Sequence, residues 1–255
     1  MRFIRRGLKL ASVGALLSIQ VWAQQPTLTA DQLLDKYVEA IGGVEKFAGI
    51  STWYEKREVT GDLTDYVPAG RAPTQFKKHG VVEYFFKAPN FRITSVRTDR
   101  NELVVESGCD GKESWSYSPT WGMHKQKPTP DREYACETGL KPFPLTLREA
   151  KARIEMKGQK NVDGRSTFMI RAQIPERQGW DLYYLDSQSY LLLRMDSRRG
   201  PRQVTTLFSD YREVEGVQVP FQVARHADNT DAVTKIQEVQ VNVPIDDRVF
   251  RKPNF

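Results

Sequence analysis

The feature that most constrains the fold is the alternation of apolar and polar residues that runs through most of the chain after residue 50. Side chains on a β-strand point alternately to the two faces of a sheet, so a strand with one buried face shows this period of two. Turn signals such as Asp110-Gly111, Asp163-Gly164 and Glu215-Gly216 separate the alternating segments. The pattern predicts roughly eleven to thirteen antiparallel strands.

One hairpin stands out in residues 81–96, VVEYFFKAPNFRITSV. Pro89 and Asn90 suit the central positions of a β-turn, because proline presets φ and asparagine tolerates left-handed geometry. The apolar residues that alternate on either side of this turn are Val82, Tyr84, Phe86, Phe91 and Ile93. We therefore expect a hairpin with an apolar face that something must cover.

A single helix precedes the strands, in the segment TLTADQLLDKYVEAIGG. Thr29 and Gln32 have the spacing of a capping box, and Gly42-Gly43 can end the helix. One face of the predicted helix carries the apolar residues Leu33, Leu34, Tyr37, Val38 and Ile41. An antiparallel sheet with one apolar face can fold as a sandwich, close as a barrel or wrap around such a helix, and the pattern leaves these alternatives open.

The first 23 residues have the pattern of a secretory signal peptide: a basic start, a short apolar stretch and a small-x-small site ending at Ala23. The alternative is a retained N-terminal anchor. The interpretation as a signal peptide predicts export to the periplasm and one mature domain from residue 24 to residue 255. Cleavage would leave 34 basic and 32 acidic residues, so the charge does not indicate nucleic-acid binding.

Two further features concern the middle of the chain. Cys109 and Cys136 fit an oxidising compartment and are predicted to form a disulfide, the alternative being two buried thiols. The proline-rich stretch from Ser118 to Ala150 is weakly periodic, as a lid or binding element would be, although a plain surface loop fits equally well.

The sequence offers little for catalysis. His79, His124 and His226 lie in different regions, and none has the spacing of a metal-binding motif. There is no nucleophile elbow, phosphate loop or dinucleotide fingerprint. Asp246-Asp247 is best interpreted as a turn or a helix cap, because adjacent strand residues point apart. We therefore predict no enzymatic activity, no metal and no cofactor.

Several segments together resemble the LolA-like family of periplasmic outer-membrane lipoprotein carriers. GVVEYFFKAPNFRI followed by LVVESGCDGKESWSYSP is similar to the family's hairpin and its DGK-x-x-W-x-Y-x-P pattern, and VNVPIDDRVFRKP is similar to its closing segment. YYLDSQSYLLLRMDS and FSDYREVEGVQVPF resemble uncharacterised relatives. The resemblance implies a mainly β fold with a few helices: a half-open, curved antiparallel barrel of about eleven strands, with the N-terminal helix and a lid segment across its mouth.

In these carriers an apolar cavity holds acyl chains, so the resemblance favours a cavity lined by aromatic residues. The alternative is that the same side chains pack a filled core. The candidates are Trp53, Tyr84, Phe86, Phe91, Trp115, Tyr117, Trp180, Tyr184 and Phe221.

One position departs from the family pattern. Where the carriers have an arginine just before the proline of the hairpin turn, this sequence has Ala88. In the family that arginine closes the helical lid and controls cargo release. Lys87 precedes Ala88 on the opposite face of the strand, and an ammonium does not replace a planar guanidinium. The resemblance therefore does not carry the latch over to this chain.

Together these features predict a monomeric periplasmic protein that binds acyl chains of a lipid or lipoprotein, with a role as a carrier in lipoprotein sorting. An envelope membrane protein is a further expected partner. Two alternatives remain open from the sequence: a structural or signalling envelope module with a filled core, and a secreted hydrolase.

Overall fold

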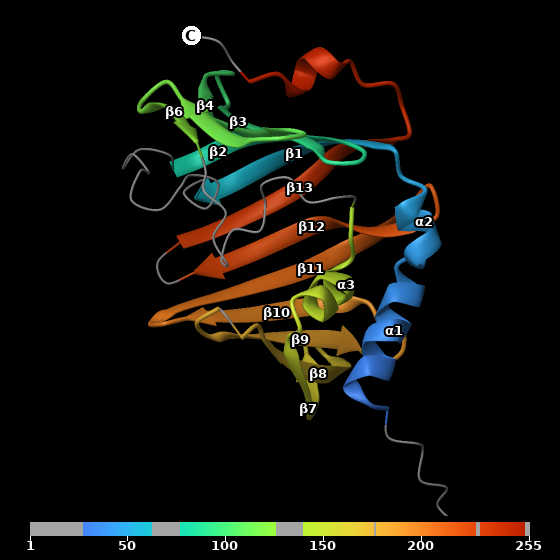
Figure 1. Ribbon diagram of the computed structural model, residues 1–255. Helices are drawn as coiled ribbons and strands as arrows, with labels where there is room; N and C mark the ends of the chain where they lie inside the picture. Colours follow the sequence, from blue (N-terminus) through green and yellow to red (C-terminus); the bar gives the residue numbers. More distant parts are fainter. Residues whose placement is uncertain (1–27, 63–76, 126–139, 176, 228–229, 253–255) are drawn as a thin grey trace, which may run out of the picture.

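The computed structural model describes residues 28–62, 77–125, 140–175, 177–227 and 230–252, and a single antiparallel sheet dominates it (Figure 1). The sheet has thirteen strands in the order β6-β5-β4-β3-β2-β1-β13-β12-β11-β10-β9-β8-β7. In the part of the chain that the structure describes, β6 and β7 are edges, so the sheet is curved and open. The predicted fold class is confirmed, although the sheet has thirteen strands where the resemblance implied about eleven.

The strands are β1 (Thr52–Asp62), β2 (Lys77–Lys87), β3 (Phe91–Thr98), β4 (Leu103–Asp110), β5 (Ser114–Ser118), β6 (Gly122–Lys125), β7 (Arg153–Val162), β8 (Arg165–Gln173), β9 (Trp180–Asp186), β10 (Leu192–Arg199), β11 (Arg202–Val214), β12 (Val217–Ala227) and β13 (Thr230–Val241). The helices are α1 (Ala30–Ala40), α2 (Val44–Ala48), α3 (Phe143–Glu149) and the 3₁₀ helix η2 (Asp247–Phe250). Both β6 and α3 fall in the stretch that the sequence predicts as an irregular cover.

Helix α1 begins at the predicted capping box. The Thr29 hydroxyl accepts a hydrogen bond from the Gln32 backbone N–H at 3.2 Å, and the Gln32 side chain accepts one from the Thr29 N–H at 2.9 Å. These two bonds satisfy backbone donors that a helix leaves unpaired at its N-terminus. The predicted apolar face is buried against one end of the sheet, in a cluster with the strand residues Ile170, Ala172, Tyr183, Leu185 and Leu192. We call the sheet face that α1 and α3 cover the inner face.

Gly42 allows the end of α1 to lie close to the β11–β12 turn. Its φ is +117°, and a Cβ at this position would lie 2.3 Å from the Gly216 carbonyl oxygen. At the same junction the Gln218 N–H donates to the Ile41 carbonyl at 3.0 Å. This contact holds the helix across the inner face, and it needs a residue without a side chain.

The predicted hairpin is confirmed as β2 and β3, but its apolar residues point to both faces. Because Lys87 pairs with Phe91, residues on the two strands share a face only when their numbers are both odd or both even. Val82 and Phe86 therefore belong to inner-face clusters, whereas Phe91 and Ile93 lie on the other side, which we call the outer face.

A C-terminal segment covers the apolar part of the outer face. Phe250, on η2, is 1% exposed and packs with Ile93 and Trp115. Its ring centroid lies 5.6 Å from that of Phe91. Lys87 forms an ion pair with Asp247 and so fastens the same segment to the β2–β3 turn. Figure 1 shows this segment running over β3 and β4.

Several predictions lie outside the described residues. These are the signal peptide at residues 1–23 and Cys136, so the Cys109–Cys136 disulfide stays a prediction; Cys109 itself is completely buried on β4. None of the described helices is long and apolar enough to cross a membrane.

Candidate ligand-binding cavity

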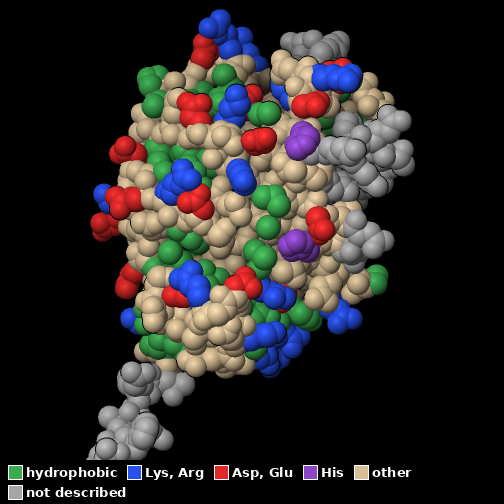
Figure 2. Space-filling view, turned by 180° about the vertical axis from the view of Figure 1, so that it is seen from behind, with side chains coloured by type: hydrophobic (Ala, Val, Ile, Leu, Met, Phe, Trp, Pro, Cys, Tyr) green, Lys and Arg blue, Asp and Glu red, His purple; other side chains and the backbone are tan. Residues whose placement is uncertain are grey.

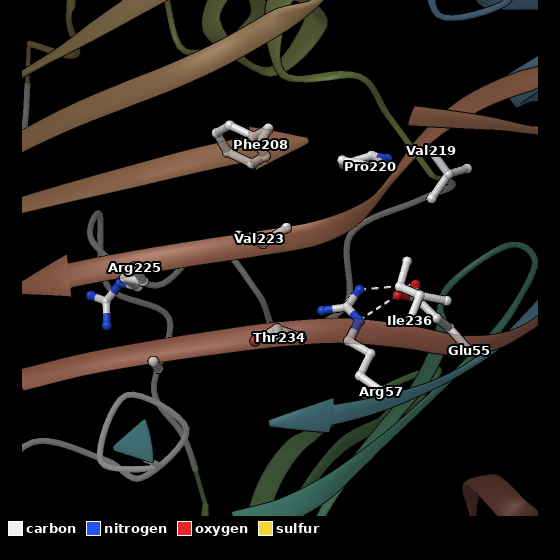
Figure 3. Close-up of a pocket in the computed structure, with 10 residues that line it drawn as sticks. Glu55, Arg57, Phe208, Val219, Pro220, Val223, Arg225, Thr234 and Ile236 are labelled. Carbon is white, nitrogen blue, oxygen red and sulfur yellow. Dashed lines mark hydrogen bonds and ion pairs between the residues drawn. The ribbon is translucent and has the colours of Figure 1, made fainter. Parts of the chain in front are cut away.

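Two adjoining cavities lie between the inner face of the sheet and the helices. The first has a volume of about 480 Å³ and is lined by side chains of β1, β11, β12 and β13 (Figure 3). The second, of about 500 Å³, extends from there beneath α1, α2 and α3. Each volume is in the range of small-molecule sites. The residues that line both cavities are Glu55, Arg57, Phe208, Val219 and Pro220.

Alternation along the strands makes most of the lining apolar. Inward-facing residues of β12 and β13 follow one another at every second position, because that is the spacing of one face of a strand. In the first cavity the apolar lining residues are Phe208, Val219, Pro220, Val223, Ala232 and Ile236. Val223 and Thr234 are direct partners across the β12–β13 pair, so Thr234 places a hydroxyl beside this apolar wall.

Helix α3 closes the second cavity. The Phe143 ring stacks on the Tyr183 ring with a centroid distance of 4.4 Å and an interplanar angle of 3°, and it also contacts the Tyr37 ring at 4.7 Å. Leu140, Lys141 and Pro142 line the cavity just before the helix. The described part of the stretch from Ser118 to Ala150 therefore does form part of the cavity wall, as a lid would.

An ion pair lies where the two cavities meet. Glu55 and Arg57 are two residues apart on β1, and both carboxylate oxygens of Glu55 accept hydrogen bonds from the Arg57 guanidinium, the Nη2–Oε2 bond measuring 2.9 Å. The Trp53 indole N–H also donates to Glu55, at 3.1 Å. Glu55 is only 3% exposed, so these bonds replace the water that a buried carboxylate loses.

Burial also shifts the pKa of two other groups near this pair. It raises the pKa of the Tyr84 hydroxyl, and nearby Arg92 and Arg57 oppose that shift. It lowers the pKa of the Arg225 guanidinium, on β12 at the other end of the first cavity. Both shifts show that this part of the interior disfavours charge that has no solvent around it.

The structure brings only part of the predicted aromatic set to the cavities. Trp53 and Tyr84 line the second cavity. Phe86 is completely buried in the same inner-face cluster as Trp53 but lines neither of the two cavities. Phe221 is partly buried beside that cluster, with the Arg212 guanidinium 4.4 Å from its ring centroid, and it too lines neither cavity.

The remaining predicted aromatics lie on the outer face. Phe91, Trp115 and Tyr117 belong to the cluster that contains Phe250. The Tyr184 hydroxyl donates to Asp196 at 2.9 Å, while its neighbour Tyr183 lines the second cavity. The Arg171 guanidinium lies 5.9 Å from the Trp180 ring centroid, and Arg171 shares the outer face of its strand pair with Leu182.

The turn that lacks the family arginine does not reach the cavities. Ala88 is exposed, and its N–H donates to the Ser51 carbonyl at 2.8 Å. Lys87 points away from the cavities, toward Asp247 and the Ile245 carbonyl. The guanidiniums that do line the cavities come from other strands, at Arg57 and Arg225.

Sequence reasoning missed the charged residues of the cavity, although the alternation contains them. In STWYEKREVT, Glu55 and Arg57 share a face with Trp53 and Val59, and both of those apolar residues are buried. Arg225 likewise continues the face of β12 that carries Val223. A charged residue in the apolar register of a strand is the signal that could have identified them.

Other polar groups do not assemble into a catalytic or metal site. The three histidines are exposed, and Figure 2, from behind, shows histidine side chains lying apart from one another. Asp246 caps η2 by accepting from the Arg248 N–H at 2.8 Å, as the sequence predicts for a helix cap. Among the described residues, no group of three or more histidine, cysteine, aspartate or glutamate side chains is placed to hold a metal ion.

No protein-family model matches the sequence, and no curated protein matches it at a significant level. Solved structures do match the fold. A LolA superfamily protein from Nitrosomonas europaea superposes with a TM-score of 0.58 at 11% identity, covering 89% of this chain and 99% of the other. A DUF1329 family protein from Desulfovibrio piger gives 0.57 at 12% identity, covering 88% and 98%.

A third structure, from Vibrio parahaemolyticus, is described as an outer membrane lipoprotein-sorting protein domain. It superposes with a TM-score of 0.55 at 10% identity and covers 87% of this chain and 97% of the other. At such identities the likeness concerns the fold, and it extends over nearly the whole described chain. The protein therefore has the fold of the LolA-like proteins, as the hairpin and the C-terminal segment of its sequence predict.

Proposed function

We propose that this protein binds the acyl chains of a lipid or lipoprotein in the periplasm and carries them without chemistry of its own. The observation that supports this most is the pair of adjoining cavities, which lie between sheet and helices and are lined mainly by apolar side chains. Burying an acyl chain there contributes about 0.8 kcal/mol for each methylene removed from water. Long chains would therefore bind durably and short ones weakly.

Two further observations support the same function. One of the similar structures is described as a lipoprotein-sorting domain of the outer membrane, so a role in lipoprotein sorting is the more specific form of the proposal. The basic and apolar pattern of residues 1–23 supports export to the compartment where such cargo moves. A monomer that meets an envelope membrane protein to receive or deliver cargo fits this role.

The test is mass spectrometry of organic extracts from the protein, purified without detergent from its native host. The extract of the wild type is compared with that of Val223→Trp, which fills the first cavity from β12, and of Gln222→Trp, which adds the same ring one residue away on the opposite face. We expect stoichiometric lipid or acylated peptide in the wild type and in Gln222→Trp, and its loss in a folded Val223→Trp.

The opposite result has an equally clear meaning. Wild-type extracts without lipid, together with failure to take up fluorescent acyl probes, would rule out the proposed function. The alternative of an envelope module that acts through protein partners would then be the one to pursue.

A further inference from the structure

We propose that the ligand is an acyl amphiphile with an anionic head, a carboxylate or a phosphate, and that the head binds Arg225 while the chain runs along β12 toward α3. This inference rests on the proposed function and adds the class of head group. It depends on how charge is distributed along the cavity, for which no feature of the fold comparison provides a reason.

The cavity has a polar end and an apolar end. Along the inner face of β12, Arg225 is followed by Val223, Val219 and Val217, and the last two line the second cavity. Beyond them lie Tyr183 and Phe143 under α3. A chain that enters the apolar end therefore leaves its head at Arg225, as an amphiphile requires.

The two guanidiniums of the first cavity occupy separate places. Arg225 pairs with Ala232 across β12 and β13, and Arg57 pairs with Ile236 across β1 and β13. Ala232 and Ile236 are four residues apart on β13, which corresponds to about 13 Å along the strand. Figure 3 shows Arg225 on one side of the cavity and the Glu55–Arg57 pair on the other.

The described lining of the first cavity carries more positive than negative charge. It contains two guanidiniums, Arg57 and Arg225, and one carboxylate, Glu55. Arg57 and the Trp53 indole engage that carboxylate. An anionic head would balance the excess, and a guanidinium can present two parallel N–H donors to a carboxylate or a phosphate.

The environment of Arg225 favours an anion beside it. Burial lowers the pKa of this guanidinium, because the charged form loses solvation inside the sheet. A carboxylate or phosphate next to it would offset that loss, whereas a neutral head would not. Thr234 adds a hydroxyl to the same wall of the cavity and can donate to an anionic oxygen.

The test compares three ligands with the same saturated chain and different heads: palmitate, hexadecyl phosphate and hexadecanol. Each displaces a fluorescent acyl probe from the wild-type protein at neutral pH. We expect one or both anionic ligands to bind at least about tenfold tighter than hexadecanol, since hydrogen bonds to charged groups are among the strong ones. Preference for palmitate alone identifies a carboxylate head, and preference for hexadecyl phosphate alone identifies a phosphate head.

Variants locate the head. In Arg225→Gln the anionic preference should disappear while hexadecanol binds as in the wild type, which also reports that the cavity is intact. Arg225→Met provides the same test if the glutamine variant does not fold. Arg198→Gln is the matched control, because Arg198 is an exposed arginine of β10 that lines neither cavity, and it should keep the full preference.

Two outcomes overturn the inference and differ from failure of the proposed function. Equal binding of all three ligands to the wild type, or a preference that survives in Arg225→Gln, would refute an anionic head at Arg225 while leaving acyl binding in place. Displacement of the probe by none of the ligands would instead refute acyl binding, and the inference with it.

Discussion

Glu55 and Arg57 form a two-bonded ion pair on one strand, with the carboxylate 4% and the guanidinium 34% exposed. The pair faces both cavities, in a register where the flanking residues Trp53 and Val59 are buried and apolar. A buried ion pair is costly to break from one side, because the remaining charge stays without its partner. This asymmetry makes the pair a sensitive point of the fold.

Replacing Glu55 alone should therefore destabilise the protein. We expect Glu55→Gln to lower the free energy of unfolding by roughly 2–3 kcal/mol, less than the 3–5 typical of fully buried pairs because Arg57 keeps some contact with water. Urea denaturation at neutral pH measures this loss. Glu58→Gln, an exposed carboxylate on the opposite face of β1, should change the value by less than about 0.5 kcal/mol. Equal midpoints for the two variants would contradict the role of the ion pair.

Helix α3 should depend on Phe143 for its position over the second cavity. Truncation in Phe143→Ala removes the stacking on Tyr183 and the contact with Tyr37. We expect a loss of roughly 2–4 kcal/mol in unfolding free energy. The same variant should release a bound fluorescent acyl probe faster in stopped-flow displacement. Val44→Ala, which truncates an apolar residue that is 49% exposed, should leave both quantities nearly unchanged. An unchanged release rate in Phe143→Ala would show that α3 does not gate the cavity.

The C-terminal segment offers two adjacent residues with opposite expectations. Phe250 is 1% exposed and fills the outer-face cluster, whereas Val249 is 37% exposed. Phe250→Ala should cost about 3–4 kcal/mol because it leaves a cavity beside Phe91 and Trp115. Val249→Ala should cost less than about 0.5 kcal/mol. Thermal and urea unfolding compare the two, and similar losses would mean that the segment does not anchor through Phe250.

The stability of the β9–β11 region should depend on acid. Burial alone would raise the pKa of Asp196, but hydrogen bonds from Arg194, Thr205 and Tyr184 outweigh it and hold this pKa below its ordinary value. Hydrogen bonding to Asp196 and burial also raise the pKa of Tyr184 to about 12, so its hydroxyl remains a donor at neutral pH. A depressed carboxylate pKa stabilises the fold above the unfolded pKa, near 3.9, and that stabilisation is lost as the pH falls through the folded value.

Asp196→Asn tests this dependence. At neutral pH the variant should be less stable than the wild type by about 2–3 kcal/mol. The difference should be constant above about pH 5 and should shrink below about pH 4, because the wild-type carboxylate then protonates. Urea unfolding at a series of pH values measures it. A difference that does not change down to about pH 3 would show that the Asp196 charge has no part in stability.

The sequence by itself determined the elements of this protein. The Thr29–Gln32 capping box and the apolar face of the following segment predict α1 correctly, because capping and helical periodicity are local properties. Alternation with intervening turn residues predicts an antiparallel sheet, and Pro89 with Asn90 predicts the β2–β3 turn. The resemblance of several short segments adds the curved, open form of that sheet.

Only the tertiary structure decided which face of each strand meets a cavity. Alternation says that Phe86 and Tyr84 share a face and that Phe91 belongs to another set, but both sets are apolar. What distinguishes them is the covering element, since α1 and α3 cover the inner face and η2 covers the outer one. Those elements come from remote parts of the chain, so no local pattern reports their position.

The charged cavity residues depend on the same long-range assembly. Glu55 and Arg57 come from β1, and Arg225 comes from β12, more than 160 residues later, with β13 paired between the two strands. The sequence places each of them in an apolar register, which is a local fact. Their arrangement around one cavity follows from the pairing of β1, β13 and β12, and strand pairing between distant segments is decided by the packing of the whole sheet.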